Sequence, residues 1–211
     1  PIVPNAKQIE DSETLDVTTN SHDLAIHFMA LHWANDPVGQ IIQSARALQP
    51  DGLFQAVCLG GQTLNELRIC LAQAESEVTG GLSPRIAPMG EIRDLGALLQ
   101  RAGLALPVAD NITVLTSYKD AFHLMHDLRN FGETNALNAR LRHPTKRAIF
   151  DRCAEIYAKT FAEDGKIIAT FEFLFLSGWA PSADQPKPLR PGSATSRLAD
   201  ALKTTEKPLR D

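Results

Sequence analysis

Glycine-rich phosphate-binding patterns are missing from this 211-residue chain, since GxGxxG, GxGxG and the P-loop occur nowhere in it. No apolar run approaches the roughly 20 residues that a membrane-spanning helix needs, and the first residues lack the basic-then-apolar layout of a signal peptide. Basic residues are not in excess, because the net charge is −4. We therefore expect neither a membrane span nor a general affinity for nucleic acid.

Cysteine is also scarce. Cys58, Cys70 and Cys153 are odd in number and lie in apolar segments, which favours buried free thiols over a disulfide or a metal site. The composition is that of an ordinary globular protein, with 44% hydrophobic and 22% charged residues. The length suits one sizeable domain, or one domain with an insertion. Together these features predict a cytoplasmic protein.

What the chain does contain is a central β-α-β pattern. Near-continuous apolar runs at residues 23–31 and 53–59 flank an amphipathic stretch, 37–48, and a turn at 49–52. Runs of this kind are typical of parallel strands covered on both faces, joined by a right-handed crossover. Because ligands of open α/β sheets bind beyond the carboxyl ends of such strands, we expect the site near residues 31–36 and 60–63.

Further elements follow from periodicity and turn residues. Residues 63–78 have helical spacing, and Thr63 with Glu66 matches the capping-box pattern. The remaining predictions are a short strand ending near residue 9, helices at 91–102, 117–131 and 144–161, strands at 111–115 (after a bulge or bend) and 167–179, and little order from residue 181 onward.

Several of these stretches resemble a known family. The sequence LHW at 31–33, the turn at 48–52 and the closing strands are similar to the second half of class I S-adenosylmethionine-dependent methyltransferases. More narrowly, the chain resembles a branch that includes relatives of the biotin-pathway malonyl-carrier methyltransferase and a mitochondrial complex I assembly factor that hydroxylates an arginine. That resemblance rests on GGQTLNELR at 60–68, GLSP at 81–84, DLG at 94–96 and GSAT at 192–195.

The resemblance implies an α/β, Rossmann-like class I methyltransferase sheet that is incomplete at its N-terminus, with a helical insertion before the last strand. The C-terminal part of the core would comprise residues 1–116, the insertion or lid 117–162, the last core strand 163–180 and a tail 181–211. Because the chain begins at Pro1 without the family's glycine-rich loop, we expect a processed or truncated form. Its exposed sheet edge would allow a homodimer.

The resemblance also implies S-adenosylmethionine as the cofactor. By position, Asp11 resembles the carboxylate that accepts from the adenine amino group, and Ser12 offers its backbone amide. Phe28 and Met29, at the end of the first long strand, stand where the family's serine-rich run faces the amino-acid part of the cofactor. A solvated loop charge remains the alternative for Asp11.

On the substrate side, the resemblance implies that His32 and Trp33 form a wall between cofactor and acceptor. The alternative is structural: a tryptophan that anchors the helix and a histidine bonded to backbone. Arg85, together with arginines of the connector near Arg140, would receive an acidic partner or an acyl-carrier surface, or else form a solvated basic face. No catalytic residue can be named, because methyl transfer from a sulfonium depends mainly on positioning.

Three functions are compatible with these residues. The first is a methyltransferase acting on a small molecule, a carrier-bound acyl group or a protein. The second is a methyltransferase-fold assembly factor that hydroxylates a protein arginine, with a respiratory-complex subunit as its partner. The third is a non-catalytic interaction protein.

Overall fold

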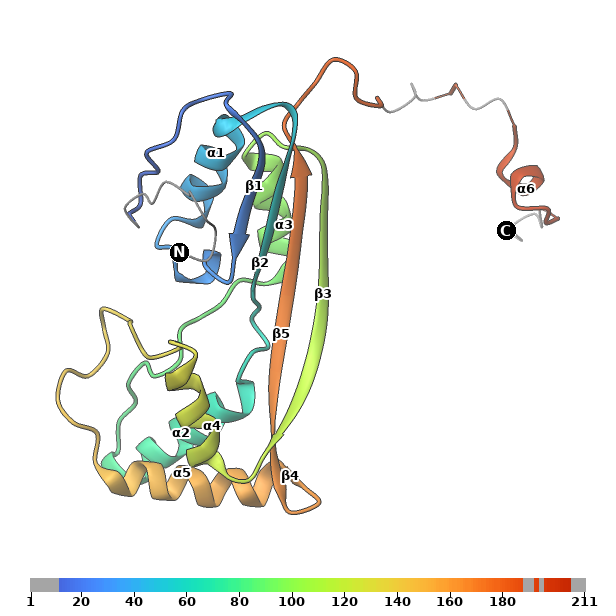
Figure 1. Cartoon of the computed structure of the whole chain (residues 1–211). Helices are drawn as coiled ribbons and strands as arrows, with labels where there is room; N and C mark the ends of the chain where they lie inside the picture. Colours follow the sequence, from blue (N-terminus) through green and yellow to red (C-terminus); the bar gives the residue numbers. More distant parts are fainter. Residues whose placement is uncertain (1–11, 188–191, 194–195, 206–211) are drawn as a thin grey trace. The chain divides into compact units, whose positions relative to one another are not determined.

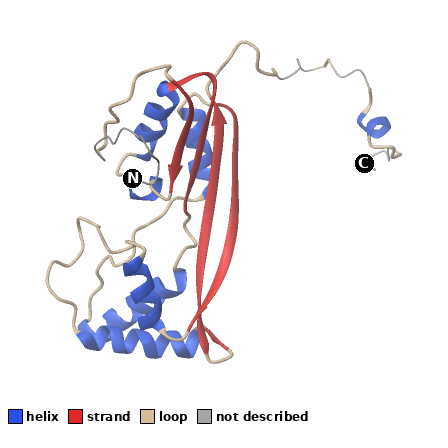
Figure 2. Ribbon diagram, in the orientation of Figure 1, coloured by secondary structure: helices blue, strands red, loops and turns tan. Residues whose placement is uncertain are grey.

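The computed structural model describes residues 12–187, 192–193 and 196–205, in two compact units, Pro1–Pro181 and Ser182–Asp211. The first unit is built on a mixed sheet in the order β1-β2-β5-β3, with β4 paired to β5 (Figures 1 and 2). β1 and β2 are parallel, and the other pairs are antiparallel. The strands are β1 His22–Phe28, β2 Leu48–Leu59, β3 Ala105–Tyr118, β4 Ala162–Glu163 and β5 Lys166–Trp179.

Side-chain caps explain where two of the described helices begin. The Asp36 side chain accepts a hydrogen bond from the Gly39 N–H at 2.9 Å at the start of α1. Asp120 does the same for the His123 N–H in α4. The helices are η1 Leu31–Trp33 (3-10), α1 Pro37–Ala47, α2 Asn65–Thr79, α3 Ile92–Arg101, α4 Ala121–Asn130, α5 Arg147–Thr160 and, in the second unit, α6 Leu198–Ala201. No described helix is both long and apolar enough to cross a membrane.

The long strand β5 contributes to two hydrophobic cores through its two faces. Leu174 and Leu176 pack with residues of α1, α3 and β2. Ile167 and Ala169, nearer its start, pack with α2, α4 and α5. Because side chains alternate along a strand, the two cores lie on opposite faces of the sheet. Helices α2, α4 and α5 therefore form a second layer at one end of β3 and β5 (Figure 1).

Coverage of the sheet differs from the prediction. Strands β1 and β2 were expected to be buried on both faces, but Ile26 is 63% exposed and Phe28 75% exposed. Phe175 and Trp179 of β5 and Ile112 of β3 are exposed as well. The register places these side chains on one face, which the described residues leave uncovered beyond α4. The predicted double coverage is therefore wrong for this face.

The turn predicted at 49–52 is also wrong. Residues 48–52 belong to β2, where the pairing passes from His22–Leu48 to Leu24–Leu53. Asp51 takes a left-handed conformation, with φ of 67°, so the extra residues bulge out without ending the strand.

The capping box is a further correction. The side chains of Thr63 and Glu66 form hydrogen bonds with strand β5 instead of with the first turn of α2. The Thr63 hydroxyl pairs with the backbone of Glu172, and both carboxylate oxygens of Glu66 accept from the N–H and hydroxyl of Thr170. These bonds fasten α2 to the sheet, and its first turn has no side-chain cap.

Other boundaries shift by a few residues. The helix predicted from residue 117 begins at Ala121, because Ser117 and Tyr118 still pair with β5. Strand β3 is longer than the predicted 111–115, and the expected irregularity falls between Ala105 and Val108. The predicted strand near residue 9 lies outside the described residues.

Candidate functional site

The carboxyl end of β1 turns sharply into the site. Met29 has a left-handed φ of 51°, and its N–H donates to the Val57 carbonyl at 2.8 Å. The short helix η1 follows, and its Leu31 is buried in the core. This anchor fixes the direction of the next two side chains, His32 and Trp33, whose rings lie 5.7 Å apart.

The His32 imidazole is paired with a residue 101 positions away. Its Nε2 atom lies 3.1 Å from the Glu133 carboxylate, and the histidine side chain is only 3% exposed. Glu133 is positioned by the end of α4, where Gly132 has a φ of 85° and the Glu133 N–H donates to the Leu128 carbonyl. This is a Schellman ending, which needs glycine for its left-handed residue. The Nδ1 atom of His32 is buried and has no hydrogen-bond partner among the described residues.

Two cavities meet at this pair. The first, which we call the His32 cavity, has a volume of about 390 Å³. Its lining combines apolar side chains of α2 and α4 with polar ones from the loops, including His32, Leu67, Leu71, Arg85, Met125, Arg129, Glu133, Arg140 and Phe150.

The second, which we call the Met29 cavity, has a volume of about 550 Å³ and lies against β3 and β5. Five of its twelve lining residues are aromatic, and the lining includes Met29, Trp33, Tyr118, Phe131, Glu133, Phe171 and Phe173. Both cavities are lined by Trp33, Leu59, Leu128 and Glu133. They therefore adjoin beyond the carboxyl ends of β1 and β2, where ligands of α/β sheets bind.

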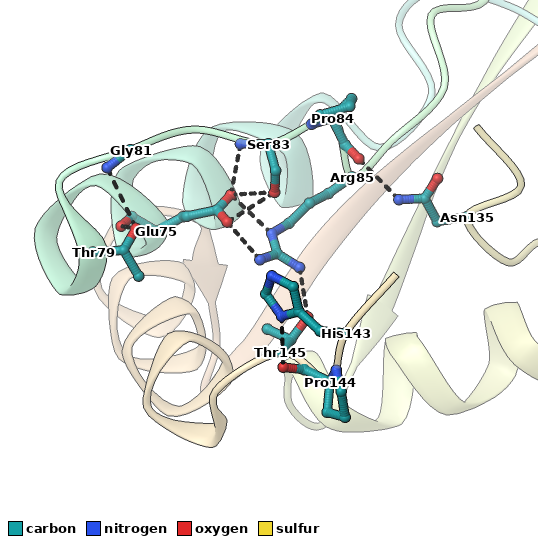
Figure 3. Close-up of polar contacts among 10 residues, drawn as sticks. All are labelled: Glu75, Thr79, Gly81, Ser83, Pro84, Arg85, Asn135, His143, Pro144 and Thr145. Carbon is teal, nitrogen blue, oxygen red and sulfur yellow. Dashed lines mark hydrogen bonds and ion pairs between the residues drawn. The ribbon is translucent and has the colours of Figure 1, made fainter. Parts of the chain in front are cut away.

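The wall of the His32 cavity is fastened by a largely buried ion pair (Figure 3). Arg85 donates two hydrogen bonds to Glu75, at 3.0 and 2.7 Å, and a third to the Thr145 hydroxyl at 3.0 Å. The Ser83 N–H and hydroxyl also donate to Glu75. Hydrogen bonding by Arg85, followed by Ser83, holds the pKa of Glu75 below its usual range. Arg85 is thus engaged with Glu75 and Thr145, so it is not part of a solvated basic face.

The first glycine after β2 leaves room for a neighbouring carboxylate. A Cβ atom on Gly60 would lie 2.5 Å from an oxygen of Glu172. That buried carboxylate accepts from the Gln62 N–H at 3.0 Å and from the Asn111 side chain at 2.8 Å. This end of the predicted site is therefore closed by protein groups.

The structure brings some of the predicted site residues together and separates others. Met29 and Trp33 line the Met29 cavity, and His32 and Trp33 line the His32 cavity. Phe28 is exposed on the uncovered sheet face and lines neither cavity. Ser12 donates to the Thr14 carbonyl at 2.6 Å, and Asp11 lies outside the described residues.

Two contributors were missed from sequence. Glu133 follows Gly132, the helix-ending glycine, which was the available signal for a positioned residue. Glu75 stands four residues after Leu71 on the buried side of α2, where a carboxylate needs a partner.

Metal-ligand clusters and cysteines were the other features to locate in the structure. The described residues contain no group of three or more His, Cys, Asp or Glu side chains that could hold a metal ion. The three cysteines are buried and free.

Comparison with solved structures defines the fold. A Bacillus halodurans protein described as a candidate methyltransferase superposes with a TM-score of 0.52 at 16% identity, over 82% of this chain and 76% of that one. The YcgJ protein of Bacillus subtilis gives a TM-score of 0.50 at 14% identity, over 81% and 69%. The chain has the class I methyltransferase fold.

Comparison by sequence finds two kinds of enzyme. The mitochondrial arginine-hydroxylase NDUFAF5 of Danio rerio is 37% identical over 203 residues, covering 95% of this chain and 63% of the relative. The human protein of the same name is 37% identical, covering 92% and 56%. The malonyl-[acyl-carrier protein] O-methyltransferase of a Methylovorus strain is 33% identical, covering 82% and 56%. The chain thus spans 56% to 63% of the length of these relatives. No protein-family model matches it.

These relatives correct one prediction. A cytoplasmic location was expected because no targeting segment was found. The relatives that are 36% or 37% identical are named as mitochondrial proteins, so that prediction is wrong.

Proposed function

We propose that this chain forms the acceptor-binding part of an S-adenosylmethionine-dependent methyltransferase. The observation that carries the proposal is the pair of cavities that adjoin at Trp33, Leu59, Leu128 and Glu133, beyond the carboxyl ends of parallel strands. Such a junction gives the methyl donor and the methyl acceptor separate cavities that share one wall. The methyltransferase fold and the similarity to an O-methyltransferase support the same activity.

The Met29 cavity fits the cationic end of this cofactor. Faces of aromatic rings attract cations, and Trp33, Tyr118 and Phe171 line the cavity. When bound, S-adenosylmethionine supplies a methyl group on a positively charged sulfur. We assign Met29 to the cofactor side, and Asp11 and Ser12 to its adenine end.

The protein's part in methyl transfer is to orient the acceptor and keep water out. Leu59 and Leu128 are buried at the shared wall, where they exclude water. Trp33 and His32 face the acceptor in this proposal, and the Glu75–Arg85 pair keeps the loop above the His32 cavity in place.

A second function, hydroxylation of a protein arginine, is favoured by one observation. The Met29 cavity joins aromatic rings to the Glu133 carboxylate, a combination that suits a guanidinium group. The similarity to NDUFAF5 agrees with it and would give the chain a mitochondrial location and a respiratory-complex subunit as partner. Carrier-bound acyl groups remain the alternative acceptor under methyl transfer.

Calorimetric titration of the 211-residue chain with S-adenosylmethionine and its demethylated product tests the first proposal. We expect a Kd tighter than roughly 100 µM, equivalent to about 5.5 kcal/mol. Met29→Lys should weaken binding at least about tenfold by repelling the sulfonium. Ile69→Lys, on the exposed side of α2, is the matched control and should bind as the parent does. No binding by the folded chain would refute the assignment of the Met29 cavity to the cofactor.

Mass spectrometry separates the two reactions. An arginine-containing peptide or a malonyl-carrier protein that gains one CH₂ group has been methylated, whereas a gain of one oxygen marks hydroxylation. An oxygen gain on the peptide without any methylation would favour the second function.

A further inference from the structure

The connector between α4 and α5 is bonded to the rest of the chain only near its two ends (Figure 3). The Asn135 side chain donates to the Pro84 carbonyl at 2.9 Å, and the Thr145 hydroxyl accepts from Arg85 at 3.0 Å. Between these two anchors lie residues 136–144, which we call the strap. Within the described part of the chain, the strap has no hydrogen bond or ion pair to any residue beyond its anchors. Its position can therefore follow a ligand.

The strap contributes one arginine, Arg140, to the lining of the His32 cavity. This residue is half-buried and donates through Nη1 alone, to the carbonyls of Ala136 at 3.4 Å and Leu137 at 2.9 Å. Its Nε and Nη2 atoms have no partner among the described residues. Together they form the edge of a guanidinium that binds both oxygens of a carboxylate or phosphate side by side. Arg140 thus keeps a pair of donors suited to an anion.

The other charges of the lining do not neutralise this arginine. Arg85 is paired with Glu75. Glu133, the one carboxylate that the described residues contribute to the lining, lies 3.1 Å from the His32 ring. Arg129 also lines the cavity, and it is exposed, with no ion pair to any described residue. Two arginines of the lining are therefore without a counter-ion.

The sequence around the strap adds to the positive charge. Residues 134–150 contain four Lys or Arg residues and no Asp or Glu, although the whole chain has a net charge of −4. Of these, Arg142 and Lys146 are exposed and form no ion pair within the described part of the chain. Clustered charge of one sign raises the local concentration of ions of the opposite sign. An anionic ligand is therefore favoured at the His32 cavity over a neutral one.

We propose that Arg140 determines the specificity of the His32 cavity by binding a carboxylate or phosphate group of the ligand side-on, and that the strap closes on the bound anion. The ligand class is an anion on an apolar stem, because Leu67, Leu71 and Met125 supply apolar surface to the cavity. The proposal rests on the proposed function only in taking this ligand to be the methyl acceptor.

Hexanoate, hexyl phosphate and hexanamide test the selection by chemical-shift titration of the 211-residue chain, without cofactor. We expect at least one of the anions to bind about tenfold more tightly than the amide, the range of a charged hydrogen bond that solvent partly screens. The tighter anion tells carboxylate from phosphate. Arg140→Gln should remove the preference and leave the affinity for hexanamide unchanged. Arg142→Gln removes the same charge from the same strap but outside the described lining, so this matched control should retain most of the preference.

Hydrogen exchange of the backbone amides tests closure of the strap. Saturation with the tighter anion should slow exchange across residues 136–144 in the parent chain and not in Arg140→Gln. Equal affinity for anions and amide, no binding of any probe, equal losses in Arg140→Gln and Arg142→Gln, or unchanged exchange in the strap would overturn the proposal. Failure to bind S-adenosylmethionine would refute the assignment of the Met29 cavity to the cofactor while leaving these readouts intact.

Discussion

The carboxylate of Glu75 holds the wall of the His32 cavity through bonds to Arg85 and Ser83, and its side chain is only 5% exposed. Glu75→Gln leaves the Arg85 charge buried without its partner. We expect the free energy of unfolding to fall by about 3 kcal/mol, measured by urea denaturation. Glu77→Gln breaks the exposed pair with Arg152 and should change stability much less. Equal losses in both variants would contradict this role.

The same residue predicts a pH dependence. Because Arg85 lowers the pKa of Glu75 in the folded chain, folding favours the ionised form. The resulting contribution to the free energy of unfolding is fully present when the pH is above the ordinary pKa range of glutamate. It is lost as the pH falls through the lowered pKa that Glu75 has in the folded chain. In acid, therefore, the difference in unfolding free energy between parent and Glu75→Gln should shrink. A constant difference between neutral pH and strong acid would contradict the coupling.

The cysteines should be unreactive in the folded chain. Burial raises the pKa to about 11 for Cys58 and to about 12 for Cys153, so little thiolate exists near neutral pH. The pKa of Cys70 is raised to about 11 by burial and by the nearby Glu66 carboxylate. We expect a thiol reagent to modify all three only after denaturant is added, as followed by intact mass. Rapid labelling of any of them under native conditions would show local opening.

Single residues of the site were only partly predictable. His32 and Trp33 could be placed because they directly follow an apolar strand. Glu133 could not be linked to His32, since 101 residues separate them and their contact depends on how α4 packs. Arg85 was treated as a free cation, because sequence alone does not reveal that Glu75 reaches it from the preceding helix.

At the scale of elements, prediction succeeded where local chemistry decides. α1 begins at the predicted Pro37, because the Asp36 side chain caps it and proline suits the first helical turn. It ends one residue before the predicted end. Prediction failed where tertiary hydrogen bonds compete with local ones. Thr63 and Glu66 matched a capping box, yet both side chains are hydrogen-bonded to strand β5. Likewise, Asp51 was placed in a turn but lies in a bulge of β2.

The bulge at the start of β3 supplies a test of backbone strain. Leu106 is 50% exposed and has a φ of 49°, a conformation that costs a residue with a Cβ atom roughly 1–2 kcal/mol. Leu106→Gly and Leu106→Ala both remove the same exposed side chain, and only the glycine relieves the strain. We expect the glycine variant to be more stable by about 1 kcal/mol in thermal unfolding. An alanine variant of equal or greater stability would rule out strain at this position.

At the scale of the whole chain, one face of the sheet is left uncovered by the described residues. Ile26, Phe28, Ile112 and Phe175 lie on it, all between 42% and 75% exposed, and β1 is an edge strand of the sheet that the described residues form. Large exposed apolar areas and unpaired edges promote association. The periodicity of residues 23–31 correctly indicated a strand, but no property of one strand could reveal which faces its neighbours would cover.

We therefore expect the 211-residue chain to self-associate through this face, with a second copy as the occupant. Ile26→Lys places a charge at its centre, where burial against another copy would require desolvation, so the variant should shift toward monomer in sedimentation analysis. Ile69→Lys adds the same charge to an exposed isoleucine on α2 and should leave the association state unchanged. If the parent chain is monomeric at all concentrations tested, or if both variants dissociate it equally, this face is not the contact between copies.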